Sequence, residues 1–218
     1  MSEISAQLVR ELRDRTGAGM MDCKKALAAC GGDMEQAIQE LRKKGLKSVE
    51  KRAEKLAAEG VVLSYIHPGS RIGVLLELNC ETDFVARGES FLALAKDIAM
   101  HIAWAKPRFV AREEVTEDVK KREEEVFLAQ LKPEQQKMAE KILQGKLEKF
   151  YEEVCLLEQI DVRDSSSKKR IKDLLTELSA SVGEKIEIRK FVRFEVGEGV
   201  EKQKADYAAE VAAVAGNA

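Results

Sequence analysis

The N-terminal part of the chain repeats apolar residues at the spacing of an α-helix. Ile4, Leu8 and Leu12 recur every four positions and predict an apolar stripe along a first helix. Two further stripes follow, and glycines separate the three segments. These glycines are Gly17 with Gly19, Gly31 with Gly32, and Gly45. Because glycine commonly follows the last residue of a helix, we predict a module of three short helices over residues 1–45.

The next segment carries many charges, and its apolar residues keep the helical spacing. Val49, Ala53 and Leu56 lie on one predicted face among charged neighbours. This pattern predicts a solvated connecting helix over residues 46–59, and we expect Gly60 to end it.

The period then changes from helical to alternating, which is typical of β-structure. Residues 61–67 are rich in β-branched and aromatic side chains, and Pro68-Gly69-Ser70 has the composition of a turn. In the segment after this turn the apolar residues at alternate positions are Ile72, Val74, Leu76 and Leu78. We therefore predict a β-hairpin with one buried face.

Amphipathic helices follow the hairpin. One apolar stripe consists of Phe91, Leu94, Ala95, Ile98 and Ile102. Pro107 is expected to end this helix, because proline does not continue one. Residues from about 113 to 182 are strongly charged and carry further helical stripes, and Pro133 is suited to the first position of a helix.

Alternation returns over residues 185–196 and predicts a third strand far from the hairpin in sequence. Its apolar residues are expected on one face, with Lys190 as the exception. They are Ile186, Ile188, Val192, Phe194 and Val196. A strand needs sheet partners, so helices between the hairpin and this strand indicate an α+β core over residues 60–197. The helical spacing of apolar residues within residues 198–218 predicts a C-terminal helical module.

Composition and charge exclude several classes of protein. The chain is 44% hydrophobic and 35% charged, which is typical of a globular protein. Its formal net charge of -2 gives no general attraction to nucleic acid or to an anionic membrane. No apolar run approaches the roughly 20 residues of a membrane span, and the N-terminus lacks the features of a secretion signal. We expect a cytoplasmic protein that binds neither nucleic acid nor membranes.

Motifs for catalysis, cofactors or metals are not found in the sequence. There is no GxxxxGK phosphate loop, no HExxH and no GxSxG. The four cysteines lack CxxC pairing and are expected to be reduced structural thiols, and His67 and His101 are expected to be structural or surface histidines. The sequence therefore predicts a protein that is not an enzyme and has no cofactor and no metal.

Two segments place apolar residues where partner contacts are plausible. In the predicted loop at residues 81–87, Phe84 and Val85 follow an acidic residue, and loops normally run over the surface. These two side chains either contact a partner or pack locally against the following helix. Met20 and Met21 are adjacent at a helix start and cannot both face one core, so either one forms an adaptable contact surface or both serve packing.

Four stretches of the chain carry a resemblance to a known family. LRDRTGAGMMDCKKAL (residues 12–27) and ELNCETDFVAR (residues 77–87) resemble, in the right order, the two signatures of the elongation factor Ts family. GKLEKFYEEVCLLEQ (residues 145–159) and ADYAAEVAA (residues 205–213) resemble later parts of the family. The resemblance thus covers nearly the whole chain.

This resemblance implies a guanine nucleotide exchange factor for elongation factor Tu. The N-terminal module would be similar to a ubiquitin-associated domain, and the protein would bind elongation factor Tu in its GDP-bound and nucleotide-free forms. By motif position, the wedge against the nucleotide domain would consist of Thr82, Asp83, Phe84 and Val85. Further contacts would come from Arg13, Met20 and Met21, and from a C-terminal helix that carries Tyr207, Ala208 and Val211.

The chain departs from the long family form, which has two related core halves and a protruding helical hairpin, because a second complete set of strands is missing. It therefore resembles the members that dimerise, and we expect a homodimer in which exposed strand edges offer a route to pairing. The alternative function is a protein-binding adaptor that uses the three-helix module. An enzyme that acts on a small molecule is a more distant alternative, because no convergent set of catalytic residues is visible.

Overall fold

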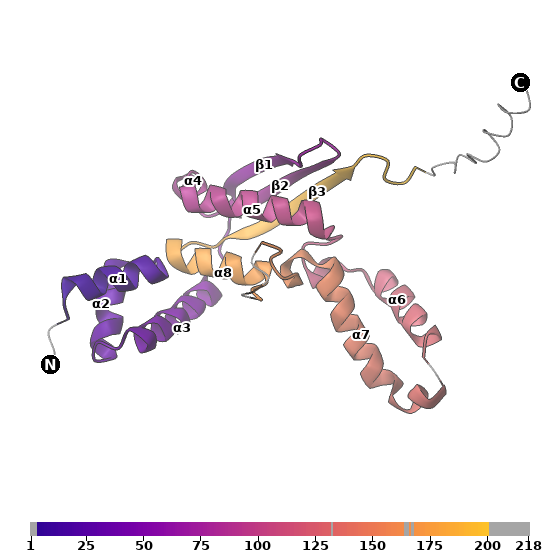
Figure 1. The fold of residues 1–218 in the computed structure, drawn as a ribbon, viewed down its shortest axis with the longest axis horizontal. Coiled ribbons are helices and arrows are strands. Elements are labelled where there is room, and N and C mark those ends of the chain that lie inside the picture. The colour runs from indigo at the N-terminus through magenta and orange to yellow at the C-terminus, as the bar shows by residue number, and fades with distance from the viewer. Residues whose placement is uncertain (1–3, 132, 164–165, 167, 201–218) are drawn as a thin grey trace, which may run out of the picture.

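The protein has a mixed α+β fold (Figure 1), as the sequence predicted. The structure, a computed structural model, describes residues 4–131, 133–163, 166 and 168–200. Its α-helices are α1 (Ala6–Thr16), α2 (Met20–Ala29), α3 (Met34–Arg52), α4 (Asp83–Ala86), α5 (Glu89–Ala105), α6 (Glu117–Ala129), α7 (Ala139–Val154) and α8 (Ile171–Val182). Its strands are β1 (Glu59–Ile66), β2 (Ile72–Cys80) and β3 (Glu187–Glu195), and its short 3-10 helices are η1 (Arg112–Glu114), η2 (Pro133–Met138) and η3 (Leu156–Glu158).

Helices α1, α2 and α3 form the predicted N-terminal three-helix module. Leu12, Cys23 and Leu27 are completely buried where the three helices meet. The Ser5 side chain accepts a hydrogen bond from the N–H of Leu8 at the start of α1, which satisfies one of the unpaired donors of a helix N-terminus. Gly17 ends α1 in the left-handed conformation, as expected for a glycine cap.

The predicted end of the third helix at Gly45 is wrong, and so is a separate connecting helix over residues 46–59. Helix α3 continues through Gly45 to Arg52, and residues 53–58 then lead without a helix into β1. Glycine inside a helix costs only about 1 kcal/mol relative to alanine. Here α3 packs against α8, and a Cβ atom on residue 45 would lie 2.9 Å from the Cβ of Ala180. Gly45 thus permits close packing of two helices.

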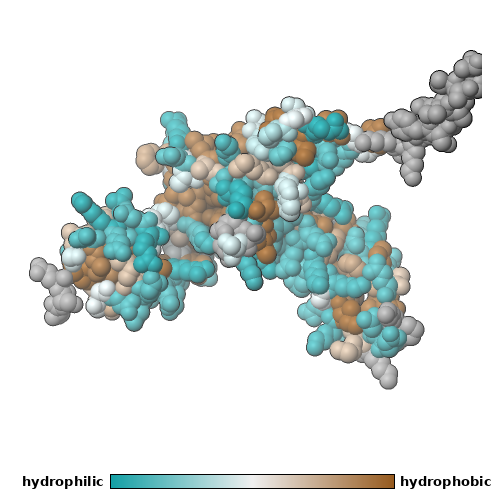
Figure 2. Space-filling view, in the orientation of Figure 1, coloured by the Kyte–Doolittle hydropathy of each residue, from teal (hydrophilic) through white to brown (hydrophobic). Residues whose placement is uncertain are grey.

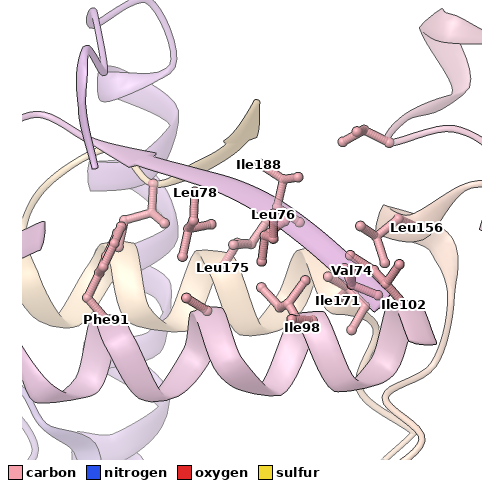
Figure 3. Close-up of a cluster of buried hydrophobic side chains, with 14 of the residues drawn as sticks. Val74, Leu76, Leu78, Phe91, Ile98, Ile102, Leu156, Ile171, Leu175 and Ile188 are labelled. Atoms are coloured by element: carbon pink, nitrogen blue, oxygen red, sulfur yellow. The ribbon is translucent and has the colours of Figure 1, made fainter. Parts of the chain in front are cut away.

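The sheet has the order β1-β2-β3, and both pairs are antiparallel. Pro68-Gly69-Ser70 forms the predicted turn, in which the N–H of His67 donates to the carbonyl of Ile72 over 2.9 Å. Helices α5 and α8 cover one face of the sheet (Figure 1). Figure 3 shows how side chains from β2, α5 and α8 meet in this core, and the labelled examples include Leu76, Phe91, Ile98 and Leu175.

Strand β3 contains a β-bulge, which corrects the predicted face of its apolar residues. Glu77 pairs with Lys190, but the next residue of β2, Leu78, pairs with Ile188. Arg189 is therefore the extra residue, and the side-chain alternation shifts by one position after it. Ile186 and Ile188 face the core as predicted.

Beyond the bulge the two faces of β3 are exchanged. Phe191 packs against the core, and the Arg193 side chain is only 8% exposed and donates to the carbonyl of Ala103. The residues predicted to share a face with Ile186 and Ile188 lie on the opposite face and are exposed: Val192, Phe194 and Val196. They join Val62, Ile66 and Leu75, and together these six residues form what we call the open sheet face.

Helices α6 and α7 form a hairpin that protrudes from the core at the end of the molecule remote from α1 and α2 (Figure 1). At its base Phe150, Val154 and Cys155 form a separate buried cluster. Pro133 begins the short 3-10 helix η2 rather than an α-helix. In the face seen in Figure 2, hydrophilic residues cover most of this hairpin, and larger hydrophobic areas lie over the central body.

Candidate partner-binding surface

The loop at residues 81–87 contains a single helical turn, α4, directly after strand β2. Thr82 occupies the N-cap position in extended conformation, and its Oγ1 accepts a hydrogen bond from the N–H of Val85 at 3.4 Å. Threonine is favoured at this position because its hydroxyl satisfies a free helix donor. Asp83 lies in the first turn, where a negative charge is favoured, and pairs with Arg87 at 2.9 Å.

Within this turn the apolar side chains have different environments. Val85 is half-buried and packs against the core, and Ala86 is buried. Phe84 is 84% exposed. Local packing is therefore the right interpretation for Val85 and the wrong one for Phe84. A rigidly backed helical turn thus presents one large aromatic ring to solvent.

Glu184 holds the backbone of this turn from a distant part of the chain. Its Oε2 accepts hydrogen bonds from the N–H groups of Glu81 (3.1 Å) and Thr82 (3.0 Å). Its Oε1 accepts from the Thr82 hydroxyl at 2.6 Å. These bonds join residues 102 and 103 positions apart in sequence.

Glu81 makes the reciprocal connection. Its carboxylate accepts from the N–H of Lys185 at 2.7 Å and from Nη1 of Arg52 at 2.9 Å. The hydrogen bond from Lys185 and the Arg52 guanidinium hold the pKa of the Glu81 carboxyl below its ordinary value. We call Glu81, Glu184 and Arg52 the tip clasp. Sequence reasoning missed all three as site residues, because nothing in the local pattern relates residue 184 to residue 82.

The predicted N-terminal contact residues are exposed at the junction of α1 and α2. Met21 is 65% exposed and Met20 is 39% exposed at the first turn of α2. Arg13 is exposed in the last turn of α1, where its carbonyl accepts from the N–H of Gly17. Cys23 rather than either methionine enters the module core.

The N-terminal module is attached to the core close to the tip clasp. Ser181 at the end of α8 donates to the carbonyl of Gly17, and Arg52 at the end of α3 binds Glu81. In Figure 1, α1, α2 and α4 all lie away from the α6–α7 hairpin, toward the same end of the molecule. The structure therefore brings Arg13, the two methionines and Phe84 to one end.

The remaining candidate residues divide into those the structure describes and those it does not. Tyr207, Ala208 and Val211 lie outside the described residues. His67 is exposed and lies 3.1 Å from the Tyr65 hydroxyl, and His101 is buried beside Gln159.

The described part of the chain lacks metal-binding clusters, disulfides and membrane-spanning helices. None of the residues described there forms a group of three or more metal-binding side chains, and its cysteines have free thiols. No described helix is both long and apolar enough to span a membrane.

Comparison with known proteins gives consistent matches along the chain. The family model described as Elongation factor TS matches residues 3–198. Elongation factor Ts of Desulforamulus reducens is 60% identical over 217 residues, which cover 98% of both chains. The protein of the same name from Geobacter metallireducens is 57% identical over 217 residues, or 98% of this chain and 99% of that relative.

A third relative, elongation factor Ts of Carboxydothermus hydrogenoformans, is 55% identical over 212 residues, which cover 96% of this chain and 97% of the relative. The matched lengths take in nearly the whole chain. The chain therefore belongs to the elongation factor Ts family, whose members are translation elongation factors.

Proposed function

We propose that this protein is a guanine nucleotide exchange factor for elongation factor Tu, and that Phe84 inserts between helices of Tu and disturbs its phosphate and Mg²⁺ site. The observation that supports this most is the exposure of Phe84, which is 84% accessible on a turn whose other apolar residues are packed. An exposed aromatic ring on a rigid support suits a binding hot spot, because aromatic anchors dominate interface energies.

Exchange of this kind requires binding and no chemical step on the nucleotide. The factor must bind the vacant or distorted GTPase more tightly than the GDP-bound form, because a ligand shifts an equilibrium only through its differential affinity. By reciprocity, the bound factor weakens GDP. The phosphates are held by several charge-assisted hydrogen bonds and Mg²⁺ by oxygen ligands, so a small displacement in the partner removes several of these contacts together. The protein is on this account not an enzyme, and it acts in the cytoplasm.

Further contacts extend the same surface. Thr82 and Asp83 frame the wedge, and Val85 supports it from the core side. Arg13, Met20 and Met21 form a second contact with the nucleotide domain of Tu, for which flexible methionine side chains are well suited. The C-terminal residues Tyr207, Ala208 and Val211 form a third contact in this proposal. Helices α1, α2 and α3 then act as one binding module, and residues 198–218 as another.

The protein also forms a homodimer in this proposal, through the open sheet face. That face carries apolar side chains from β1, β2 and β3, including Val62, Leu75 and Phe194. Exposed apolar side chains gathered on one face are a common mark of an interface. A two-fold axis lets the same patch meet itself, so a second copy provides a matching apolar partner. It would also supply the second set of strands that this short chain lacks.

The test is GDP release from Tu, followed with a fluorescent GDP analogue at limiting amounts of the factor. Truncation of an aromatic hot spot typically costs about 2 to 4 kcal/mol, so Phe84→Ala should slow the catalysed release by tens to several hundredfold. Met20→Ala should have a smaller effect. The matched control is Trp104→Ala, which removes another exposed aromatic ring, 73% accessible, at the C-terminal end of α5.

Release with Phe84→Ala at the wild-type rate would show that the wedge is not at Phe84. A pull-down from a bacterial lysate addresses the adaptor alternative. If Tu is absent from the captured material and another protein is enriched, the exchange function itself is wrong.

A further inference from the structure

We propose that Glu184 and Glu81 are positioning residues that hold the Phe84 turn in its partner-binding conformation, and that Arg52 links this conformation to the N-terminal module. This inference rests on the proposed exchange function. It assigns a role to three charged residues of the tip clasp, none of which is proposed to touch the partner.

The clasp occupies the gap between two regular elements. Strand β2 ends at Cys80 and α4 begins at Asp83, so residues 81 and 82 lie outside both. Backbone N–H groups that lie between elements need a partner elsewhere, because an unpaired donor is costly. Both N–H groups find the same acceptor, Oε2 of Glu184. Hydrogen bonds to a carboxylate are charge-assisted and about twice as strong as neutral ones.

The two glutamates hold each other's backbone segments. Glu184 binds the N–H groups of residues 81 and 82, and Glu81 binds the N–H of Lys185, next to Glu184. This reciprocity fixes the end of β2 against the connection from α8 to β3. Arg52 brings a positive charge to Glu81, because its Nη1 lies 2.9 and 3.2 Å from the two Glu81 oxygens.

The bonded atoms hold the backbone of the turn that carries Phe84. Thr82 donates its hydroxyl proton to Glu184, and the same oxygen accepts from the N–H of Val85. The buried thiol of Cys80 donates to the carbonyl of Thr82 at 3.1 Å. Val85 packs on the core behind the turn. Each of these contacts lowers the freedom of the turn before binding, and a preformed binding segment loses less entropy when it meets its partner.

Arg52 connects the Phe84 turn to the second proposed contact surface, which lies on the N-terminal module. It is the last residue of α3, the helix that also packs against Ala180 through Gly45. Ser181 of the same α8 segment binds the carbonyl of Gly17 beside the α1–α2 junction. The turn with Phe84 and the surface with Met20 and Met21 are thus both fixed to the C-terminal end of α8.

The experiment is a double-mutant cycle on catalysed GDP release from Tu, with wild type, Glu184→Ala, Phe84→Ala and the double variant. Loss of the clasp lowers the fraction of factor in the competent conformation, and the apparent affinity falls by that fraction. For Glu184→Ala we expect the half-saturating concentration of factor to rise roughly tenfold, which is within the range for residues in one hydrogen-bond network. The maximal rate at saturation should stay at the wild-type value.

In the Phe84→Ala background the effect of Glu184→Ala should disappear, because there is no wedge left to position. Glu184→Gln keeps one acceptor oxygen and should have an intermediate effect, and it serves as the milder variant if Glu184→Ala folds poorly. The matched control is Glu177→Ala, which removes an exposed glutamate of α8 that pairs with Lys169. It should leave both kinetic parameters unchanged.

The possible outcomes distinguish the positioning role of the tip clasp from the wedge role of Phe84. If Phe84→Ala is impaired but Glu184→Ala and Glu184→Gln are not, the positioning role is overturned and the wedge stands. Equal effects of Glu184→Ala with and without Phe84 would likewise overturn it, because they indicate a general loss of structure. If Phe84→Ala itself releases GDP normally, the wedge is wrong and the positioning role falls with it.

Discussion

Gly45 in helix α3 lies so close to Ala180 in α8 that a Cβ atom on residue 45 would come within 2.9 Å of the Ala180 Cβ. Real Cβ atoms do not approach each other this closely, so a larger residue must push the helices apart. At Gly145, in the middle of α7, no atom apart from its chain neighbours and the nearby backbone of the same helix lies within 4 Å of the ideal Cβ position. Packing therefore requires a glycine at position 45 but not at position 145, and the two glycines form a matched pair.

From this pair we predict opposite effects of the same substitution. Gly45→Leu should lower the free energy of unfolding by about 1–3 kcal/mol, the usual cost of overpacking. Gly145→Leu should raise it by up to about 1 kcal/mol, because leucine is the better helix former. Urea denaturation of both variants measures the difference. A Gly45→Leu protein as stable as wild type would contradict close packing of α3 on α8.

Gly45 also illustrates which parts of the fold were predictable from sequence. Apolar periodicity is local, so it correctly predicted the helices of the N-terminal module, the hairpin and α5. The end of α3 was not predictable, because it depends on a contact with α8, a helix far away in sequence. Glycine has the same local meaning at Gly17, where it ends a helix, and at Gly45, where it does not.

The prediction that the apolar residues of β3 share one face was wrong for a related reason. Alternation assigns faces correctly only while every residue pairs, and one additional residue, Arg189, reverses the assignment for the rest of the strand. At the candidate site, resemblance and residue chemistry pointed to Phe84, Met20 and Met21 as candidate contact residues, and the structure shows them exposed. The role of Glu184 was not predictable from the sequence, because only the folded chain brings it to Thr82.

The exchanged faces of β3 lead to a prediction about oligomeric state. Phe194 is 66% exposed on the open sheet face, so Phe194→Glu should leave the fold intact and place charges in the proposed dimer interface. We expect the wild type to sediment as a dimer and Phe194→Glu as a monomer at the same micromolar concentration. Val126→Glu, on helix α6 and 49% exposed, is the control and should remain dimeric. A monomeric wild type would disprove the proposed dimer.

Two phenylalanines provide a test of the core that is independent of function. Phe91 is completely buried against β2 (Figure 3), whereas Phe84 is 84% exposed. Phe91→Ala should cost about 3–5 kcal/mol of stability, because it leaves a cavity. Phe84→Ala should change stability by no more than about 0.5 kcal/mol, as for other surface substitutions. Urea denaturation measures both, and a large loss for Phe84→Ala would mean that its ring is packed in solution.

Buried His101 predicts how stability depends on pH. The N–H of Val162 donates to its Nδ1 at 3.4 Å, so the ring proton lies on Nε2, which donates to Oε1 of Gln159 at 2.9 Å. Burial lowers the pKa of this histidine, and the Gln159 bond and the Asp161 carboxylate oppose the shift only in part, while Arg163 adds to it. A second ring proton would also face the N–H of Val162, which is itself a donor.

The direction of this pH dependence of stability follows from proton binding in the folded and the unfolded chain. The unfolded chain binds a proton on His101 with a pKa of about 6.5, and the folded chain binds it only at lower pH. The stabilisation is therefore fully present above about pH 6.5 and is lost as the pH falls from there toward the pKa in the folded state. Between pH 7.5 and 5.5, wild type should lose up to about 1 kcal/mol more than His101→Gln, which cannot titrate. His67→Gln, at an exposed position, should follow wild type, and equal pH dependence of wild type and His101→Gln would contradict the buried neutral ring.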